Sequence, residues 1–593
     1  MMKKLKHMQI AFSGLSPFFG KYKWQFVLAI VFIILSKVSM VIAPAIEGMV
    51  TSQLFEDVQN AQSLTTIVVS FDKITKILLV LAGVYFIKTV AESIVVFYVT
   101  NAIQNTMCDL RNALQNKVRK LPVQYFDSHQ FGDVLSRITN DVDALSNAFQ
   151  QTFVQIIGGI FTVVFTFIMM IRLNVLMTCI AFLIIPGMLT ITILIVKRSQ
   201  KRFAAQQDAL GSLNSAITEM YTGYHEIVLF NKQKDAIDRF TSLNEDLRVN
   251  AFKAQFISSI IQPLNSLVTY LVIGANALIG TIRVIEGSFD PGDLQAFIRY
   301  IWYVNDPLTQ ISSLSSQIQS AFAAMGRIVE ILNEEEEIPE KQPAEKIECT
   351  TGKVTFEHVR FGYHDELLMK DLNVTVESGQ MVAIVGPTGA GKTTLINLLL
   401  RFYDVKGGSI KIDGVDIRDM KRGELRSMFG MVLQDTWLFH GTIYDNLRYG
   451  RLDARNDEIV EAAKMANVHH FIRTLPDGYN SYINEEGNNI SQGEKQLLTI
   501  ARAILKDPQI LILDEATSSV DTRLEKMLQE AMQRIMKGRT SFVIAHRLST
   551  IRNADLILVM NHGDIIEQGT HDELMAKKGA YEKLYNSQFA NQE

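Results

Sequence analysis

Six long apolar runs in the first 320 residues constrain the fold of this 593-residue chain more than any other feature. Each is about 20 residues long, the length that an α-helix needs to cross the hydrocarbon core of a bilayer. We predict six membrane-spanning helices, over residues 25–47, 77–99, 153–171, 175–196, 257–280 and 293–315. Arg299 and Asp306 interrupt the last run, and its assignment rests partly on the need to return the chain to the side of the N-terminus.

The composition fits a chain that lies partly in a membrane, since 48% of its residues are hydrophobic and the mean hydropathy is +0.13. The N-terminal lysines and the first apolar run also fit a secretory signal peptide. This run is long for one and others like it follow, so we interpret it as a retained span. The net charge of −4 gives no reason to expect binding to nucleic acid, and three distant cysteines predict neither disulfides nor a metal site.

The connections after the second and fourth runs are long and basic, whereas the others are short or poor in basic residues. By the positive-inside tendency, we place them, the N-terminus and the C-terminal domain in the cytoplasm of a multi-pass protein of the cell membrane. Both connections carry apolar residues at helical spacing, such as Leu135, Ile138 and Val142. The spans are therefore predicted to continue as helices beyond the bilayer, either to reach a cytoplasmic domain or only to pack on one another.

Four consecutive glutamates at 334–337 and two following prolines indicate a linker after the last span. Farther on, short apolar runs such as 381–385 and 541–545 alternate with helical stretches, which is typical of an α/β domain with a largely parallel sheet. We predict an α-helical transmembrane domain over residues 1–325, a linker over 326–350 and an α/β domain over 351–593.

The segment from Gly386 to Thr393 reads Gly-Pro-Thr-Gly-Ala-Gly-Lys-Thr, which fits the P-loop pattern, and it lies between an apolar strand and an apolar helix as that motif requires. Its glycines let backbone N–H groups turn toward a β-phosphate, Lys392 reaches the β- and γ-oxygens, and the Thr393 hydroxyl can bind Mg²⁺. A purely structural glycine turn is the alternative. We predict that ATP is bound by Gly386, Thr388, Gly389, Gly391, Lys392, Thr393 and Thr394.

A second pattern is the apolar run 510–513, which ends in Asp514 and Glu515. Phosphate chemistry uses carboxylates at the end of such a strand, one to hold the waters of Mg²⁺ and one to polarise the attacking water. We assign the first role to Asp514 and the second to Glu515. Ordinary surface carboxylates would explain the run alone, but not its occurrence together with the P-loop.

These motifs resemble those of half-size ABC exporters, and the resemblance extends over nearly the whole chain. Its most specific marker is Ile-Ser-Gln-Gly-Glu-Lys-Gln at 490–496, in the place of the family's Leu-Ser-Gly-Gly-Gln signature. In that family two nucleotide domains pair head to tail, and each ATP lies between one P-loop and the signature of the other protomer. The resemblance implies that Ser491 and Gly493 contact the ATP of a second subunit at a helix N-terminus.

The resemblance implies four further residues around ATP and Mg²⁺. Tyr363 would stack on adenine, and Asp521 would lie in the loop that crosses between the two nucleotide domains. Gln434 would lie near the metal and the attacking water, and His546 would contact the γ-phosphate. A strand-edge tyrosine and a structural histidine are the alternatives. The implied residues around Mg²⁺ are Thr393, Gln434 and Asp514.

In the membrane half, residues 121–127 and the stretch around 221–224 resemble the two cytoplasmic loops of exporters. In the family, a short coupling helix in the first loop docks on a nucleotide domain. The second loop is similar in position but less specific. The resemblance assigns the docking role to Tyr125, Phe126, Tyr221 and Gly223.

The signature departs from the family pattern at Gln492, where glycine is usual, and at Glu494, where glutamine is usual. A carboxylate in the first helical turn complements the helix dipole and repels ATP, which weakens the site that this signature completes on a partner. Because Lys392, Asp514 and Glu515 are intact, we predict a heterodimer whose other subunit has a consensus signature but an impaired catalytic carboxylate, as in bacterial heterodimeric multidrug exporters. Harmless drift in a homodimer is the alternative.

Lys88 and Glu92 lie within the second span at a four-residue spacing, and hence on one face of its helix. Charged residues at membrane depth are costly and usually face a bundle interior or a wet cavity. Together with Arg299 they could line a substrate path, and a structural ion pair is the alternative.

The sequence thus predicts ATP-driven export of amphipathic substrates, either drugs or lipids. Binding of ATP would close the paired nucleotide domains and turn the helices outward, and hydrolysis would reset them. A homodimeric lipid flippase and an ATP-gated channel or regulator share these motifs and stay open. The expected partners are a second half-transporter, membrane lipids and an amphipathic small molecule, but no nucleic acid.

Overall fold

The computed structural model describes residues 14–60, 69–347, 350–433, 436–484, 489–514, 522–545 and 547–588. The chain forms two compact units. The helical unit comprises residues 1–119 and 131–334, and the α/β unit comprises residues 120–130 and 335–593. The last helix of the first unit ends at Asn333, so helix continues into the segment predicted as a linker, 326–350.

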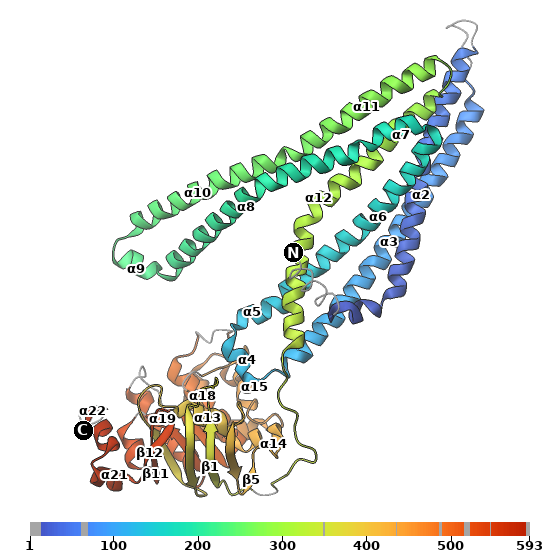
Figure 1. The fold of residues 1–593 in the computed structure, drawn as a ribbon. Coiled ribbons are helices and arrows are strands. Elements are labelled where there is room, and N and C mark those ends of the chain that lie inside the picture. Colours follow the sequence, from blue (N-terminus) through green and yellow to red (C-terminus); the bar gives the residue numbers. More distant parts are fainter. Residues whose placement is uncertain are drawn as a thin grey trace. The chain divides into compact units, whose positions relative to one another are not determined.

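The helical unit consists of long helices joined by short connections (Figure 1). Its elements are α2 (Lys23–Gln59), α3 (Phe71–Val118), α5 (Phe131–Ser136), the π-helical turn η1 (Arg137–Asp141), α6 (Val142–Leu173), α7 (Val175–Phe182), α8 (Ile184–Thr222), α9 (Tyr224–Leu229), α10 (Gln233–Ser259), α11 (Ile261–Ile285) and α12 (Pro291–Asn333). Helices α3 and α8 continue for some 20 residues beyond their apolar runs. This confirms that the spans extend as helices.

Five helical stretches among the described residues are long and apolar enough to cross a membrane, which confirms a helical transmembrane domain. They are Lys23–Gln59, Phe71–Val118, Phe131–Leu173, Val175–Thr222 and Gln233–Ile285. The predicted sixth span, 293–315, lies within the continuous helix α12. Charged residues lower its hydropathy, so its place in the membrane stays a prediction.

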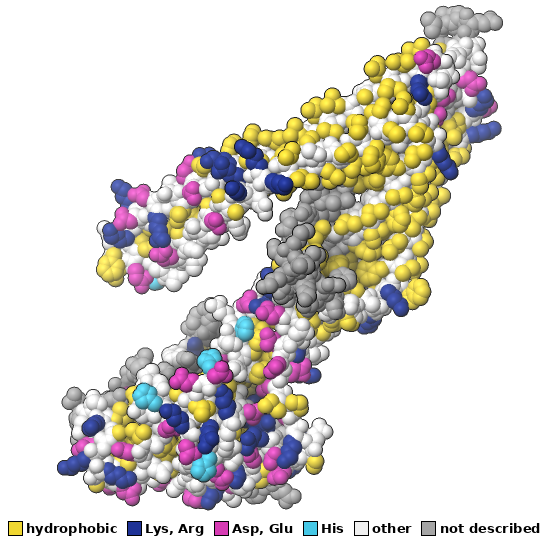
Figure 2. All heavy atoms as spheres, in the orientation of Figure 1, with side chains coloured by type: hydrophobic (Ala, Val, Ile, Leu, Met, Phe, Trp, Pro, Cys, Tyr) yellow, Lys and Arg dark blue, Asp and Glu magenta, His cyan; other side chains and the backbone are white. Residues whose placement is uncertain are grey.

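The apolar stretches keep most of their side chains on the surface of the unit. Only 11–33% of the most apolar window of each stretch is buried within the chain. Figure 2 shows hydrophobic side chains over much of this unit, and charged side chains where α8 and α10 approach α9. An apolar surface of this kind is stable when it contacts lipid or another subunit.

Helices α2 and α12 cross at two glycines. A Cβ atom at Gly48 would lie 2.4 Å from the carbonyl oxygen of Gly292, and one at Gly292 would lie 2.0 Å from that of Gly48. Only glycine permits this backbone contact. One turn or more away, the buried Tyr300 hydroxyl donates a hydrogen bond to the carbonyl of Val41 at 2.9 Å and joins the same pair of helices.

The described residues of the α/β unit form three sheets. A four-stranded antiparallel sheet has the order β2-β1-β4-β5, and a six-stranded sheet has the order β12-β11-β3-β10-β9-β6 and is parallel except for β12. The largely parallel sheet is as predicted. The strands are β1 (Val354–Phe361), β2 (Met369–Val376), β3 (Met381–Val385), β4 (Gly407–Ile412), β5 (Val415–Asp416), β6 (Phe429–Val432), β7 (Gly441–Thr442), β8 (Tyr482–Ile483), β9 (Ile510–Asp514), β10 (Thr540–Ile544), β11 (Leu556–Asn561) and β12 (Asp564–Gly569).

The six-stranded sheet separates two hydrophobic cores. Along β3, Ala383 and Val385 belong to one core, whereas Val382 and Ile384 belong to the other, as the two-residue period of a strand requires. The helices of this unit are α4 (Val123–Ser128), α13 (Lys392–Leu399), α14 (Arg422–Ser427), α15 (Ile443–Arg448), α16 (Asn456–Met465), α17 (His469–Thr474), the 3₁₀ turn η2 (Gly478–Asn480), α18 (Gln492–Lys506), α19 (Thr522–Met536), α20 (Leu548–Arg552), α21 (His571–Lys577) and α22 (Ala580–Gln588).

Candidate functional site

The P-loop connects β3 to α13, and two of its glycines have backbone conformations that disfavour other residues. Gly389 has φ +82° and Gly391 has φ +97°, both in the left-handed region. Gly391 is the N-cap of α13, and the first intrahelical bond runs from the Leu395 N–H to the Gly391 carbonyl at 3.0 Å. The N–H groups of the first helical turn therefore have no acceptor within the helix. Such a helix N-terminus can bind an anion at the loop.

Lys392 is folded back onto this loop. Its ammonium donates hydrogen bonds to the carbonyl oxygens of Gly386 at 2.7 Å and Pro387 at 3.1 Å. Burial lowers the pKa of the Lys392 ammonium below its usual value, and the nearby Asp514 carboxylate opposes that shift. A partly buried ammonium with only carbonyl acceptors gains from a polyanion, so this site fits the phosphates of ATP.

Two of the three predicted magnesium residues, Asp514 and Thr393, lie in the described part of the chain. Asp514 ends β9 and is in register with Ile544 of β10, and Thr393 lies in the first turn of α13. Within the described ranges, no three His, Cys, Asp or Glu side chains are grouped closely enough to hold a metal alone. The donor set fits a Mg²⁺ ion that shares oxygen ligands with a bound nucleotide.

Tyr363, the predicted adenine contact, contacts the helix that follows the P-loop. Its hydroxyl lies 3.0 Å from the hydroxyl oxygen of Thr394. Its ring packs edge to face with Tyr403, with centroids 5.0 Å apart, and with Phe361 at 5.1 Å. The ring remains 37% exposed, which leaves surface for a base to stack on.

The signature segment begins α18 with a reciprocal cap. The Ser491 hydroxyl and backbone N–H both donate to Oε2 of Glu494, at 2.6 and 2.9 Å. The Glu494 N–H donates to the Ser491 hydroxyl at 3.4 Å. Gly493, which lies between these two residues in the sequence, is buried. The Glu494 carboxylate thus accepts the hydrogen bonds of the Ser491 hydroxyl and N–H. By the exporter resemblance, Ser491 would instead contact a phosphate of the partner's ATP.

Four predicted residues lie outside the described ranges: Gln434, Glu515, Asp521 and His546. Their predicted roles stay predictions. The carboxyl end of β9, which directly precedes Glu515, is described and lies beside β10, two strands from the strand that leads into the P-loop.

The first loop segment, 120–130, packs within the α/β unit although it lies between membrane helices in the sequence. The Tyr403 hydroxyl donates a hydrogen bond to Asp127, and the Glu337 N–H donates to the Lys120 carbonyl at 2.9 Å. The predicted docking residue Tyr125 is buried and stacks on His129, and Phe126 contacts the Tyr125 ring edge to face. Asp127 therefore connects the side chains of this loop to Tyr403, and Lys120 connects its backbone to Glu337.

The linker is fixed next to this segment by Arg422. Its guanidinium donates to the Ile338 carbonyl at 2.9 Å, and its backbone N–H donates to Glu340 at 2.9 Å. It also forms ion pairs with Glu337 at 3.6 Å and Asp404 at 3.7 Å. The first loop, which lies between membrane helices in the sequence, and the linker, which follows the last of them, thus meet within one small region of the α/β unit.

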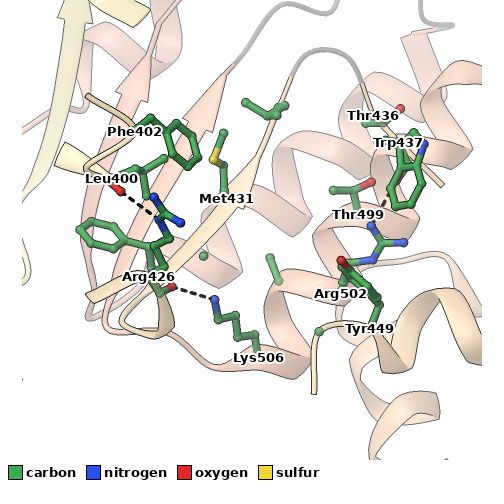
Figure 3. Close-up of a pocket in the computed structure, with 15 residues that line it drawn as sticks. Leu400, Phe402, Arg426, Met431, Thr436, Trp437, Tyr449, Thr499, Arg502 and Lys506 are labelled. Carbon is green, nitrogen blue, oxygen red and sulfur yellow. Dashed lines mark hydrogen bonds between the residues drawn. The ribbon is translucent and has the colours of Figure 1, made fainter. Parts of the chain in front are cut away.

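A groove of about 380 Å³ lies elsewhere on the α/β unit (Figure 3). Burial lowers the pKa of Lys506 and of the Arg426 and Arg502 guanidinium groups below their usual values. None of the described residues that line the groove is acidic. The principal side chains that line the groove are Phe402, Arg426, Trp437, Tyr449, Arg502 and Lys506. An acidic, partly apolar segment would therefore complement this groove.

The second loop forms the short helix α9, and its apolar side chains are exposed. Tyr224 and Leu229 of α9 are largely exposed, as is Phe230 directly after it, and the predicted docking residue Tyr221, in the last turn of α8, is 82% exposed. Gly223 caps the end of α8 and lets the chain turn into α9. The helix also carries Glu226 in its first turn.

The predicted charges in the membrane are only partly brought together. Lys88 and Glu92 form an ion pair at 3.6 Å, and Lys37, which the sequence analysis did not single out, pairs with the same carboxylate at 3.6 Å. Within the described chain, no ion pair joins Arg299 to either residue. A lysine inside an apolar run was the signal that would have identified Lys37.

Fold and motifs together define an ATP-driven membrane transporter. Family models match both parts of the chain: ABC transporter transmembrane region over residues 26–308, and ABC transporter over residues 369–518. The chain is 47% identical to the "Fatty acid ABC transporter ATP-binding/permease protein" of Mycobacterium bovis over 81% of this chain and 76% of that protein. It is 37% identical to the "ATP-dependent lipid A-core flippase" of Syntrophus aciditrophicus over 82% of this chain and 81% of the flippase.

Among solved structures, a bacterial Atm1-family ABC exporter with ATP bound is similar, with a TM-score of 0.75 and 26% identity over 96% of this chain and 98% of that one. The chain belongs to the ABC transporter family and is a half-transporter of the exporter type, with one transmembrane domain and one ATP-binding domain. Its ATP-binding domain couples hydrolysis of ATP to transport.

Proposed function

We propose that this chain is one subunit of a heterodimer that exports lipid-like amphiphiles, and that ATP is hydrolysed at its own P-loop. The capped signature carries the heterodimer proposal. Because Glu494 accepts the hydroxyl and N–H of Ser491, this signature offers a poor phosphate contact to a partner. The names of the relatives, a fatty acid transporter and a lipid A-core flippase, support a lipid-like substrate.

Hydrolysis transfers the γ-phosphoryl group to water: the bond to the bridging oxygen breaks, and a bond to the water oxygen forms. Glu515 polarises the water, Gln434 positions it, and Lys392 with His546 stabilises the charge on the γ-phosphate. When bound, Mg²⁺ neutralises charge on the β- and γ-oxygens. Residues suited to hold it are Thr393, Gln434 and Asp514.

Two contacts couple this chemistry to the membrane helices. Segment 120–130 acts through the hydrogen bond between Asp127 and Tyr403. The cationic groove of Figure 3 receives the second cytoplasmic helix of the partner subunit, and α9 of this chain docks on the partner in the same way. The exposed apolar residues of α9 and its Glu226 are the features that such a groove selects.

The test is ATP hydrolysis by the chain purified without a partner in lipid nanodiscs. We expect low turnover from the unmodified chain. Glu494→Gln releases Ser491 and removes the negative charge, so turnover should rise about tenfold, which corresponds to about 1.4 kcal/mol of transition-state stabilisation. This rise requires a homodimer in which each signature meets the other P-loop.

The chain contains a matched control. Glu573 caps Thr570 at the start of α21 with nearly the same geometry, since the Thr570 N–H donates to it at 2.9 Å and its own N–H donates to the Thr570 hydroxyl at 3.4 Å. Glu573→Gln should leave turnover unchanged. Robust hydrolysis by the unmodified chain alone would instead support a homodimeric flippase, and sustained ion conductance with both sites filled would support a channel.

A further inference from the structure

We propose that three charged residues in the transmembrane domain bind the anionic head group of an amphipathic substrate. This triad consists of Lys37 on α2 and of Lys88 and Glu92 on α3. The inference rests on the export function proposed above and names the head-group chemistry of the substrate.

The triad holds two positive charges and one negative charge. Both ammonium groups lie 3.6 Å from the Glu92 carboxylate, on its two different oxygens. This is beyond the usual length of an N–H···O hydrogen bond. One of these oxygens also accepts a hydrogen bond from Ser36 at 3.1 Å. Within the described part of the chain, Glu92 is the only carboxylate within 4 Å of either lysine, so one positive charge lacks a counter-ion.

A glycine on a neighbouring helix leaves room for Lys37. A Cβ atom at Gly158 of α6 would lie 3.1 Å from Cε of Lys37, so the absence of a side chain there leaves room for the lysine stem. Lys37 lies near the middle of the apolar run 25–47, roughly 15–18 Å of helix from either end. The side chains of Lys37 and Lys88 remain 22% and 27% exposed, so neither lysine is fully enclosed by the described chain.

These features select an anion that has an apolar body. An uncompensated ammonium at this depth is costly, and neither lysine donates a hydrogen bond to a described residue. A carboxylate or phosphate supplies both the missing charge and several acceptors. A small hydrophilic anion would lose its hydration on reaching this depth, whereas an acyl chain carries its head group into the apolar region.

The experiment measures equilibrium binding to the full-length chain in nanodiscs of neutral phosphatidylcholine, without nucleotide. The probes are oleate, oleyl alcohol, oleylamine and oleoyl lysophosphatidate, which share an 18-carbon chain and differ in the head group. We expect oleate or lysophosphatidate to bind at least tenfold more tightly than the alcohol, and the amine to bind weakest. Comparison of the two anions identifies a carboxylate or a phosphate as the preferred group.

Variants of the triad assign the effect to these residues. Lys37→Gln and Lys88→Gln should each weaken binding of the preferred anion about tenfold and leave binding of oleyl alcohol unchanged. Glu92→Gln removes the internal anion and should strengthen binding of the preferred anion severalfold. Lys76→Gln, at an exposed lysine just before the apolar run of α3, is the control that should change nothing.

Equal binding of the alcohol and both anions would overturn the proposal, as would lysine variants that fold and bind the anion normally. Lys88→Gln keeps the pair between Lys37 and Glu92, so it tests the site even if Lys37→Gln fails to fold. Because binding is measured without ATP, it is separate from the export function. Selective anion binding without ATP-dependent transport would leave the triad assignment intact and refute the proposed export.

Discussion

The hydroxyl and the ring of Tyr403 contact different functional parts of the molecule. The hydroxyl donates to Asp127 in the first loop, and the ring packs against Tyr363 beside the P-loop. Burial, with a further contribution from Asp127, raises the pKa of Tyr403 well above its usual value, so the hydroxyl stays protonated and remains a donor. We therefore interpret Tyr403 as a positioning residue between the first loop and Tyr363, the predicted adenine contact.

Tyr403→Phe tests this role, because it keeps the ring and removes only the donor. ATP affinity should change less than about twofold, since the packing against Tyr363 remains, whereas stimulation of ATP hydrolysis by substrate should fall severalfold. Steady-state hydrolysis with and without substrate measures both. Tyr363→Phe is the control: it removes the hydroxyl beside Thr394 but keeps the contact with Asp127. Equal stimulation in Tyr403→Phe and the unmodified protein would contradict the role.

A sequence indicates best those local features whose cause is close in the sequence. The positive φ values of Gly389 and Gly391 are such a feature, because φ is a local property and glycine adopts these values readily. The sequence also contains the signal for the helix cap at Ser491, since Ser-x-x-Glu before an apolar helix is a capping-box pattern. The bond between Tyr403 and Asp127 has no such signal, because 276 residues separate the two and no spacing rule pairs them.

Among the helices, α2 and α12 cross at unusually close range. At this crossing the two backbones touch at Gly48 and Gly292. Any side chain there must push the helices apart, and the buried bond between Tyr300 and Val41 would be strained with them.

Gly292→Ala or Gly48→Ala should lower the thermal unfolding midpoint by several degrees, through the clash of a single methyl group. Gly83→Ala is the matched control. A Cβ atom at this position in α3 meets nothing within 4 Å, so alanine should be neutral or slightly stabilising through its higher helix propensity. Fluorescence-detected unfolding in detergent compares the three variants. Equal midpoints would show that the crossing tolerates separation.

Strands and helices were predictable where the spacing of the apolar residues and the length of the apolar run indicate the same type of element. The apolar runs 381–385 and 541–545 were predicted as strands, and β3 and β10 lie there. The C-terminal end of α12 was harder to predict. The helix ends at Asn333, directly before the four glutamates, eight residues beyond the predicted end of the transmembrane domain at residue 325. The five apolar stretches followed from hydropathy alone, whereas charged residues in α12 obscured the sixth.

For the assembled transporter, ATP is expected to hold two ATP-binding domains together until it is hydrolysed. Glu515→Gln should therefore keep ATP bound and lower hydrolysis by at least about a hundredfold, because the water is no longer polarised. Retention of radiolabelled ATP through gel filtration, beside phosphate release, measures the two effects. Glu461→Gln, at an exposed glutamate of α16, should retain normal turnover. Normal turnover of Glu515→Gln would refute the assignment.

The position of segment 120–130 also affects how the chain is made. Asp127 leaves the ribosome 276 residues before Tyr403, a delay of roughly 15–55 s at usual rates of translation. During that interval α4 has no surface to bind, while the membrane helices on both sides of it are already being inserted. A nascent chain that stops before Tyr403 would therefore leave Asp127 without this hydrogen bond.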